Sequence, residues 1–265
     1  MSIPTIIGFL GGVGLFLWAI VSSTDNYFMF LSLSSFVMVV GGTFASTFIS
    51  YEARYVILSL KMMGKIFFSP PIGRNLLKSE VGRVIRWGYA VQKSGLPALE
   101  AETGKLKNAD KFLSFGIDMV VSGYTGDEVR GILNTAIETT FGRNTVQVGI
   151  LNAMSSASPA FGMIGTLVGL VIMLDSMGED PSALGPGLAV ALLTTLYGVL
   201  FAKLVYGPAA TKIKQREEIV RFRNYLVAEG LVLLAEKKAP RFIQDKMNSY
   251  LDPAIHFNID KEPKE

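Results

Sequence analysis

Two stretches decide the fold of this chain: SPAFGMIGTLVGL, from Ser158 to Leu170, and GPGLAVALLTTLYG, from Gly185 to Gly198. Each lies inside a charge-free run that can cross a bilayer, since a spanning helix needs about 20 apolar residues. At helical spacing, small and polar residues share one face of each stretch: Ser155, Pro159, Gly162, Thr166, Gly169 and Met173 on the first, and Gly187, Ala191, Thr194 or Thr195, Gly198 and Ala202 on the second. Lipid does not require such a face, so the pattern indicates helices that face the inside of a bundle or pore.

The composition is that of an integral membrane protein with soluble parts. Half of the 265 residues are hydrophobic, 18% are charged, and cysteine is absent. Without cysteine the chain has no disulfide, thiolate catalyst or thiolate metal site, and the single His256 cannot form a histidine cluster. In such a protein a pI of about 9.0 reflects membrane topology more than nucleic-acid binding. We therefore expect neither an enzyme nor a nucleic-acid partner.

Four charge-free runs predict an all-α protein with four transmembrane helices. They cover residues 1–24, 26–51, 144–174 and 182–202. The predicted organisation is a first transmembrane hairpin (1–51), a cytoplasmic helical domain (52–143), a second hairpin lining the ion path (144–207) and a cytoplasmic helical tail (208–265).

The distribution of charge predicts the topology. The loop of the first hairpin carries one charged residue, Asp25, and the loop of the second carries Glu179 and Asp180 beyond Asp175. Apart from Lys203, every basic residue lies in 52–143 or after residue 207. By the positive-inside rule these basic segments and both termini are cytoplasmic. No cleaved signal peptide is expected, because residues 1–4 carry no basic side chain and no short apolar region ends at a processing site.

Glycine and proline clusters divide the cytoplasmic parts into helices. We expect helices over 75–93, 97–108, 111–122 and 127 to about 141. The tail over 209–237 is expected to extend the fourth span as an amphipathic rod, with Ile213, Ile219, Phe222 and Leu226 on its apolar side.

These motifs, together with GIDMVVSGYTGDEVRGIL (116–133) and APRFIQDKMNSYL (239–251), resemble the A subunit of the bacterial flagellar stator, the MotA/PomA family. The resemblance covers nearly the whole chain. It implies a torque-generating subunit of the inner membrane, with five copies around a dimer of a single-span, peptidoglycan-binding B subunit (MotB/PomB-like). The B subunit is expected to supply an aspartate, and the rotor switch protein FliG to receive the torque.

The spans themselves indicate an ion path that is formed by more than one chain. No Asp or Glu lies within any of the four, and only Asp175 sits at a span end. A cation path needs a charge partner in a medium of low dielectric constant. The missing carboxylate must therefore come from another chain.

Candidate ion-path residues are Ser155, Pro159, Thr166, Thr194 and Thr195. Pro159 lacks an N–H, which frees the Ser155 carbonyl and is expected to kink the helix. A proline that kinks the helix only for packing would give the same sequence pattern. Na⁺ needs oxygen ligands, whereas a proton can hop through carboxylate and water, so threonines beside the partner aspartate favour sodium. Threonine hydroxyls also commonly bond their own helix, which leaves a proton-driven stator as the alternative. Only one of the adjacent threonines can face the pore.

The resemblance also implies a rotor-contacting segment. Lys93, Glu100 and Glu102 lie in it, although Gln92, Ala101 and Thr103 depart from residues that sodium-type relatives carry. Glu100 is also an ordinary first-turn helix acid. Pro208 matches a family proline with a hinge or coupling role, and a Gly-Pro step is equally an ordinary helix junction.

Two other functional classes remain open. An energiser of the ExbB/TolQ type would share the ion path but serve outer-membrane processes; its relatives have three spans, so four favour the motor. A passive membrane scaffold would explain the small-residue faces without using the threonines.

Overall fold

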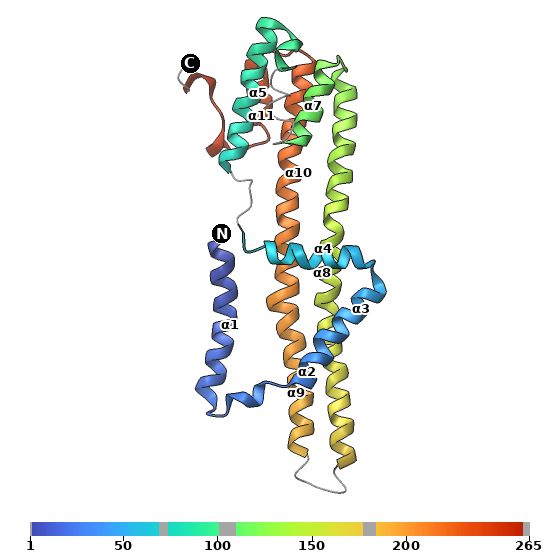
Figure 1. Ribbon diagram of the computed structural model, residues 1–265. Coiled ribbons are helices and arrows are strands. Elements are labelled where there is room, and N and C mark those ends of the chain that lie inside the picture. The colour runs from blue at the N-terminus through green and yellow to red at the C-terminus, as the bar shows by residue number, and fades with distance from the viewer. Residues whose placement is uncertain (1, 69–73, 101–109, 177–183, 262–265) are drawn as a thin grey trace. The chain divides into compact units, whose positions relative to one another are not determined.

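The structure is a computed structural model that describes residues 2–68, 74–100, 110–176 and 184–261 (Figure 1). Every regular element within these residues is helical. The long helices are α1 (Ile3–Ser23), α5 (Arg74–Ser94), α8 (Gly126–Ser176), α9 (Leu184–Leu200) and α10 (Gly207–Ala235). The shorter elements are η1 (Tyr27–Phe30), α2 (Leu33–Phe36), η2 (Val37–Gly41), α3 (Gly42–Ser50), α4 (Ala53–Lys65), η3 (Leu96–Leu99), α7 (Lys111–Val121), η5 (Phe201–Tyr206), α11 (Pro240–Asn248), η6 (Pro253–Ile255) and η7 (Ile259–Lys261).

The prediction of an all-helical protein with four spans is confirmed. Among the described residues, four helices are long and apolar enough to cross a membrane: Ile3–Ser23, Tyr27–Ser50, Gly126–Asp175 and Leu184–Ala235. The last two are about 50 residues long because each continues well beyond its apolar part. A helix of that length, at about 1.5 Å per residue, is more than twice as long as the roughly 30 Å hydrocarbon core.

Two π-helical turns interrupt the spans, η2 in the second and η5 in the fourth. Neither was predicted from the sequence. Pro208 lies two residues after the end of η5, and its missing N–H removes one helical hydrogen bond there. A wider turn can take up such a defect without ending the helix, and π turns often occur at functional positions.

By its internal contacts the chain divides into two compact units. The first contains residues 1–69 and 144–215, and the second contains 70–143 and 216–265. Our four-part division at residues 52, 144 and 208 concerns position relative to a membrane, which these contacts do not measure. It stays a prediction.

The first unit has a small core where α4 packs on α8 and the start of α10. Its buried residues include Leu151, Met154, Tyr206 and Ile213, and Met63 of α4 packs against them. In Figure 1, α4 crosses these helices instead of running along them. No helix was predicted here from the sequence, because the side chains that α4 packs on belong to α8 and α10, far away along the chain.

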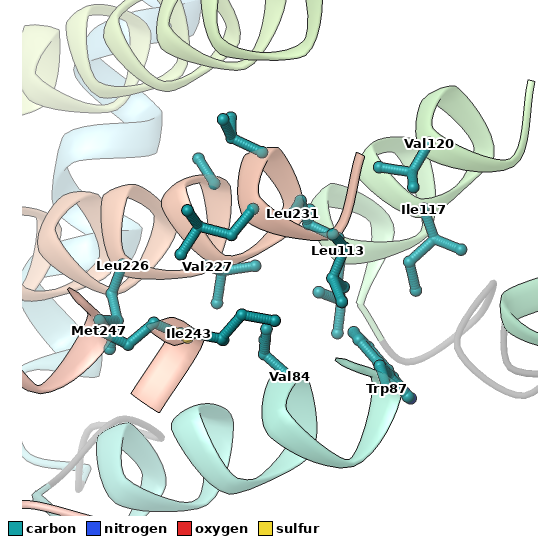
Figure 2. Packing of buried hydrophobic residues seen from close by; sticks show 14 of the residues in the cluster. Val84, Trp87, Leu113, Ile117, Val120, Leu226, Val227, Leu231, Ile243 and Met247 are labelled. Carbon is teal, nitrogen blue, oxygen red and sulfur yellow. The ribbon is translucent and has the colours of Figure 1, made fainter. Parts of the chain in front are cut away.

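The second unit has the larger core (Figure 2). The end of α10 contributes Leu226, Val227 and Leu231, which are buried among side chains of α5, α7, α8 and α11. The predicted helices over 75–93 and 111–122 correspond to α5 and α7, and the helix expected from 127 begins at Gly126 as part of α8. Of the helix expected over 97–108, residues 97–99 lie in the short η3, Glu100 is α-helical, and residues 101–109 lie outside the described structure.

The predicted apolar side of the tail is confirmed at Ile213 and Leu226, which are buried, and is wrong at Phe222. Phe222 is 38% exposed, whereas its neighbour Arg223 is 6% exposed. Arg223 pairs there with Glu80 of α5 and with Asp110, which caps α7. A buried arginine needs such partners, because an unpaired buried charge is strongly destabilising. A hydropathy pattern cannot reveal them, since the acids lie more than a hundred residues away along the chain.

A second polar contact joins α8 and α10 on the surface of the same unit. Tyr225 donates a hydrogen bond of 2.5 Å to Glu138, and Arg221 donates two, of 2.8 and 2.7 Å, to the same carboxylate. The hydrogen bond from Tyr225, and to a smaller extent those from Arg221, hold the pKa of Glu138 below its ordinary value. The carboxylate therefore stays ionised at neutral pH.

Candidate functional site

The two small-residue faces predicted from the sequence meet in the first unit, where α8 packs against α9. A Cβ atom on Gly198 would lie 2.7 Å from the carbonyl oxygen of Ser158 and 3.1 Å from Cα of Pro159. One on Gly162 would lie 2.9 Å from the carbonyl oxygen of Thr194, and one on Gly169 would lie 2.8 Å from the nitrogen of Ala191. These contacts are with backbone atoms, which cannot rotate aside. Glycine is therefore required at this contact, which we call the glycine seam.

Two serine hydroxyls bond across the glycine seam. Ser158 donates to the carbonyl of Gly198 at 3.0 Å, and Ser155 donates to the carbonyl of Ala202 at 3.1 Å. Ser158 is fully buried. Ser155 was among the residues predicted from the sequence and Ser158 was not, although its spacing of four from Gly162 was a signal that could have found it.

Thr166 and Thr195 form a hydroxyl pair between the two helices. Their Oγ1 atoms are 2.6 Å apart, and Thr166 also lies within hydrogen-bond distance of the carbonyl oxygens of Ala191 (3.0 Å) and Gly162 (3.1 Å). A hydroxyl has one hydrogen to donate and two lone pairs to accept with. The pair and the two carbonyls therefore bring together four oxygen atoms that can hold a cation or a water molecule.

The adjacent threonines have different surroundings. Thr194 is 1% exposed and donates a hydrogen bond to the carbonyl of Ala191 at 2.8 Å. It packs directly against Gly165, where a Cβ atom would lie 2.6 Å from the Cβ of Thr194. Thr195 lies on the exposed surface of the chain and Thr166 is half-buried. Because neighbours on a helix point about 100° apart, burying Thr194 in the hairpin turns Thr195 outward.

The two prolines lie in contrasting positions. Pro159 lies inside α8, which stays helical on both sides of it, and its Cα is part of the glycine seam. Pro208 is the second residue of α10, which begins where the π turn η5 ends, and it is exposed. The proline at the seam thus affects helix contact, and the proline after η5 affects helix winding.

The first hairpin is attached to α9 by contacts that the sequence did not reveal. The hydroxyl of Tyr197 donates to the carbonyl of Phe30 and accepts from the N–H of Ser32 at 3.1 Å. Gly42 leaves room for the ring of Phe161 of α8. A tyrosine in an apolar span is a weak signal by itself, because its partner carbonyl can belong to any neighbouring segment.

The predicted rotor-contact residues lie in the second unit. Lys93 is exposed near the C-terminal end of α5, and Glu100 is exposed directly after η3. Between them Gly95 has a φ of +78°, a conformation that glycine adopts at little cost, and it ends α5. Glu102 lies outside the described residues.

Comparison with known proteins identifies the family. Residues 105–223 match the MotA/TolQ/ExbB proton channel family. The chain is 33% identical over 253 residues to "Chemotaxis protein PomA" of Vibrio alginolyticus, which covers 95% of this chain and 96% of that protein. It is 27% identical over 262 residues to "Motility protein A" of Treponema pallidum (strain Nichols), covering 99% and 98% of the two chains.

Solved structures share the fold. A chain from "Structure of C. jejuni MotAB" superposes with a TM-score of 0.86 at 21% identity, covering 96% of this chain and 97% of that one. A chain from "Structure of the flagellar MotAB stator complex from Bacillus subtilis" gives 0.81, also at 21% identity, covering 96% of both chains.

The helical fold and its four apolar spans define a multi-pass inner-membrane protein of a channel-type family, and that family is not one of enzymes. Within it, the chain belongs to the MotA/PomA family, the A subunits of flagellar stators.

The glycine seam makes a testable prediction. We expect Gly198→Ala to lower the free energy of unfolding by about 1–3 kcal/mol, because overpacking at a backbone contact forces the helices apart. Gly149→Ala in α8 is the matched control, since a Cβ there meets nothing within 4 Å in the described chain. Thermal unfolding of the two purified variants measures the difference. Equal melting temperatures would show that α8 and α9 do not need this close approach.

Proposed function

We propose that this chain is the A subunit of a sodium-driven flagellar stator, which couples ion flow to torque together with a B-type partner. The observation that carries the proposal is the Thr166–Thr195 hydroxyl pair, 2.6 Å apart, between the two charge-free runs of the second hairpin. Hydroxyl and carbonyl oxygens are the ligands that a hard cation such as Na⁺ accepts in exchange for hydration water.

The need for a partner chain follows from the absence of a carboxylate in the predicted spans. The four predicted spans contain no carboxylate, so the negative charge that a cation path requires has to come from a second chain. Two solved structures that share this fold are structures of MotAB, which supports a B-type partner as that chain. We propose that this partner is a single-span, peptidoglycan-binding B subunit. We propose five A chains around a B dimer in the inner membrane, with both termini in the cytoplasm.

We assign the ion path to Thr166 and Thr195, with Pro159 and the Ser155 carbonyl shaping it. Thr194 is assigned to hairpin packing. The proton-driven alternative keeps one observation in its favour, since the Thr166 hydroxyl can be satisfied by the carbonyl of Gly162 in its own helix, as threonines commonly are. The similarity to PomA supports a motor over an ExbB/TolQ-type energiser.

The threonines distinguish the two ions. We expect Thr195→Ala and Thr166→Ala to abolish or sharply weaken sodium-driven swimming, because each removes an oxygen from the site. Thr166→Ser should retain part of the activity, and Thr194→Ala should be mild, since its hydroxyl only bonds its own helix. Swimming speed against external sodium at fixed membrane potential is the measurement. Sodium-independent swimming of the unaltered protein, or full activity of Thr166→Ala, would favour the proton.

We further propose that Lys93, Glu100 and Glu102 contact charged residues of the rotor switch protein FliG, and that Pro208 with η5 acts as a coupling hinge. Lys93 and Glu100 are exposed on the second unit, where charged groups steer and orient a transient partner more than they bind it tightly.

Charge reversal tests this contact. We expect Lys93→Glu or Glu100→Lys to impair swimming while membrane insertion and ion conduction stay normal, and compensating reversals on the rotor to restore part of the loss. Lys78→Glu is the matched control, because Lys78 is also exposed on α5 but lies about four turns away. Normal swimming of the Lys93→Glu, Glu100→Lys double variant would place the contact elsewhere.

A further inference from the structure

An apolar groove runs between α1 and the fourth span in the first unit. Three adjoining cavities of about 300, 140 and 360 Å³ make it up, and all three are lined by Phe9 of α1 and Leu204 of η5. The helix α1 is fully described and none of its residues is buried. It approaches the fourth span closely at Gly12, where a Cβ would lie 3.1 Å from Leu204. Closer to its N-terminus, Phe9 packs edge-on against Phe67, which follows α4, with ring centroids 5.6 Å apart. Met63, Gly64 and Ile66 line the second cavity beside these rings.

The groove has one polar end. Among the described residues that line it, Lys212 is the only charged one, and it lies with Thr5 and Pro4 in the first cavity. The opposite end reaches Leu17, Leu31 and Tyr197. Lys212 is half-buried and belongs to α10, on the side of the membrane to which the basic residues assign the cytoplasm.

The dimensions of the groove match one lipid tail. From Pro4 to Leu17 the groove follows α1 for roughly 20 Å, at about 1.5 Å per residue, and one leaflet of the hydrocarbon core is about 15 Å deep. The groove is therefore long enough to take the acyl chain of one phospholipid along α1.

Charge determines which lipid fits. An apolar groove within the bilayer fills with hydrocarbon, because an empty void forfeits contacts along both walls. A lysine at the end of such a groove places an ammonium at the depth of the phosphate groups and attracts anionic lipid.

We propose that the groove between α1 and the fourth span is a binding site for one phospholipid of the cytoplasmic leaflet, preferably anionic, with its acyl chain along Phe9 and Leu204 and its phosphate on Lys212. The bound tail fills the space between α1 and the fourth span that the protein leaves open. This site is separate from the ion path and does not depend on which ion is conducted.

Glycines of α1 provide matched variants for the test. A Cβ on Gly8 or on Gly14 meets nothing within 4 Å in the described chain, but only Gly8 lines the cavities described above. The A chain is purified with a B-type partner in mild detergent, incubated with phosphatidylglycerol or phosphatidylethanolamine, and examined by native mass spectrometry. We expect the unaltered protein and Gly14→Leu to retain phosphatidylglycerol, and Gly8→Leu to lose it.

The headgroup contact has its own variant. Lys212→Gln should reduce the preference for phosphatidylglycerol over phosphatidylethanolamine roughly fivefold, since one basic residue near an anionic surface contributes about 1 kcal/mol. Lys203→Gln, exposed on η5 and outside the groove, should leave the preference nearly unchanged.

If Gly8→Leu does not assemble with its partner, a photo-crosslinker at Val13, which lines the third cavity, identifies the molecule in the groove instead. A crosslink to phospholipid supports the proposal. Retention of lipid by Gly8→Leu, an unchanged preference in Lys212→Gln, or a crosslink from Val13 to another protein chain would overturn it.

Discussion

The close contact of α8 with α9 is the constraint on which the rest of the hairpin depends. Glycine backbones meet there at distances that leave no room for a Cβ, and the serine hydroxyls of Ser155 and Ser158 bond across the gap. In a membrane the hydrophobic effect does not hold helices together, so close packing and interhelical hydrogen bonds must do so. This contact buries Thr194 and leaves Thr195 beside Thr166 on the exposed side. The geometry of the residues that we propose for the ion path is therefore a consequence of the glycines.

In the second hairpin, the residues that pack α8 against α9 differ from those that present oxygen atoms to the outside. Gly162, Gly198 and Thr194 serve the helix contact, while Thr166 and Thr195 present oxygen atoms outward. The chain offers hydroxyl and carbonyl oxygens but no carboxylate in its predicted spans, as we propose for one half of a cation path. We propose that the negative charge on the second chain and the hydroxyl pair on this one form the complete site only when the two chains assemble.

Much of this structure could be predicted from the sequence, and the failures have physical reasons. The charge-free runs predict the spans because each unpaired charge in hydrocarbon is costly, and the glycine spacing predicts which faces meet. The choice of Thr195 over Thr194 could not be made, because both fall near the seam on a helical wheel and only packing separates them. The burial of Arg223, the hydroxyl contact of Tyr197 and the helix α4 each depend on partners distant in sequence.

The most direct test of the account is sodium flux into liposomes that contain the A chain alone, or the A chain with a B-type partner that carries its membrane aspartate. We predict flux only with both chains, and loss of that flux when the partner's aspartate is replaced by asparagine. Flux through the A chain alone would contradict the account, because it would mean that the path is complete without a second chain's carboxylate.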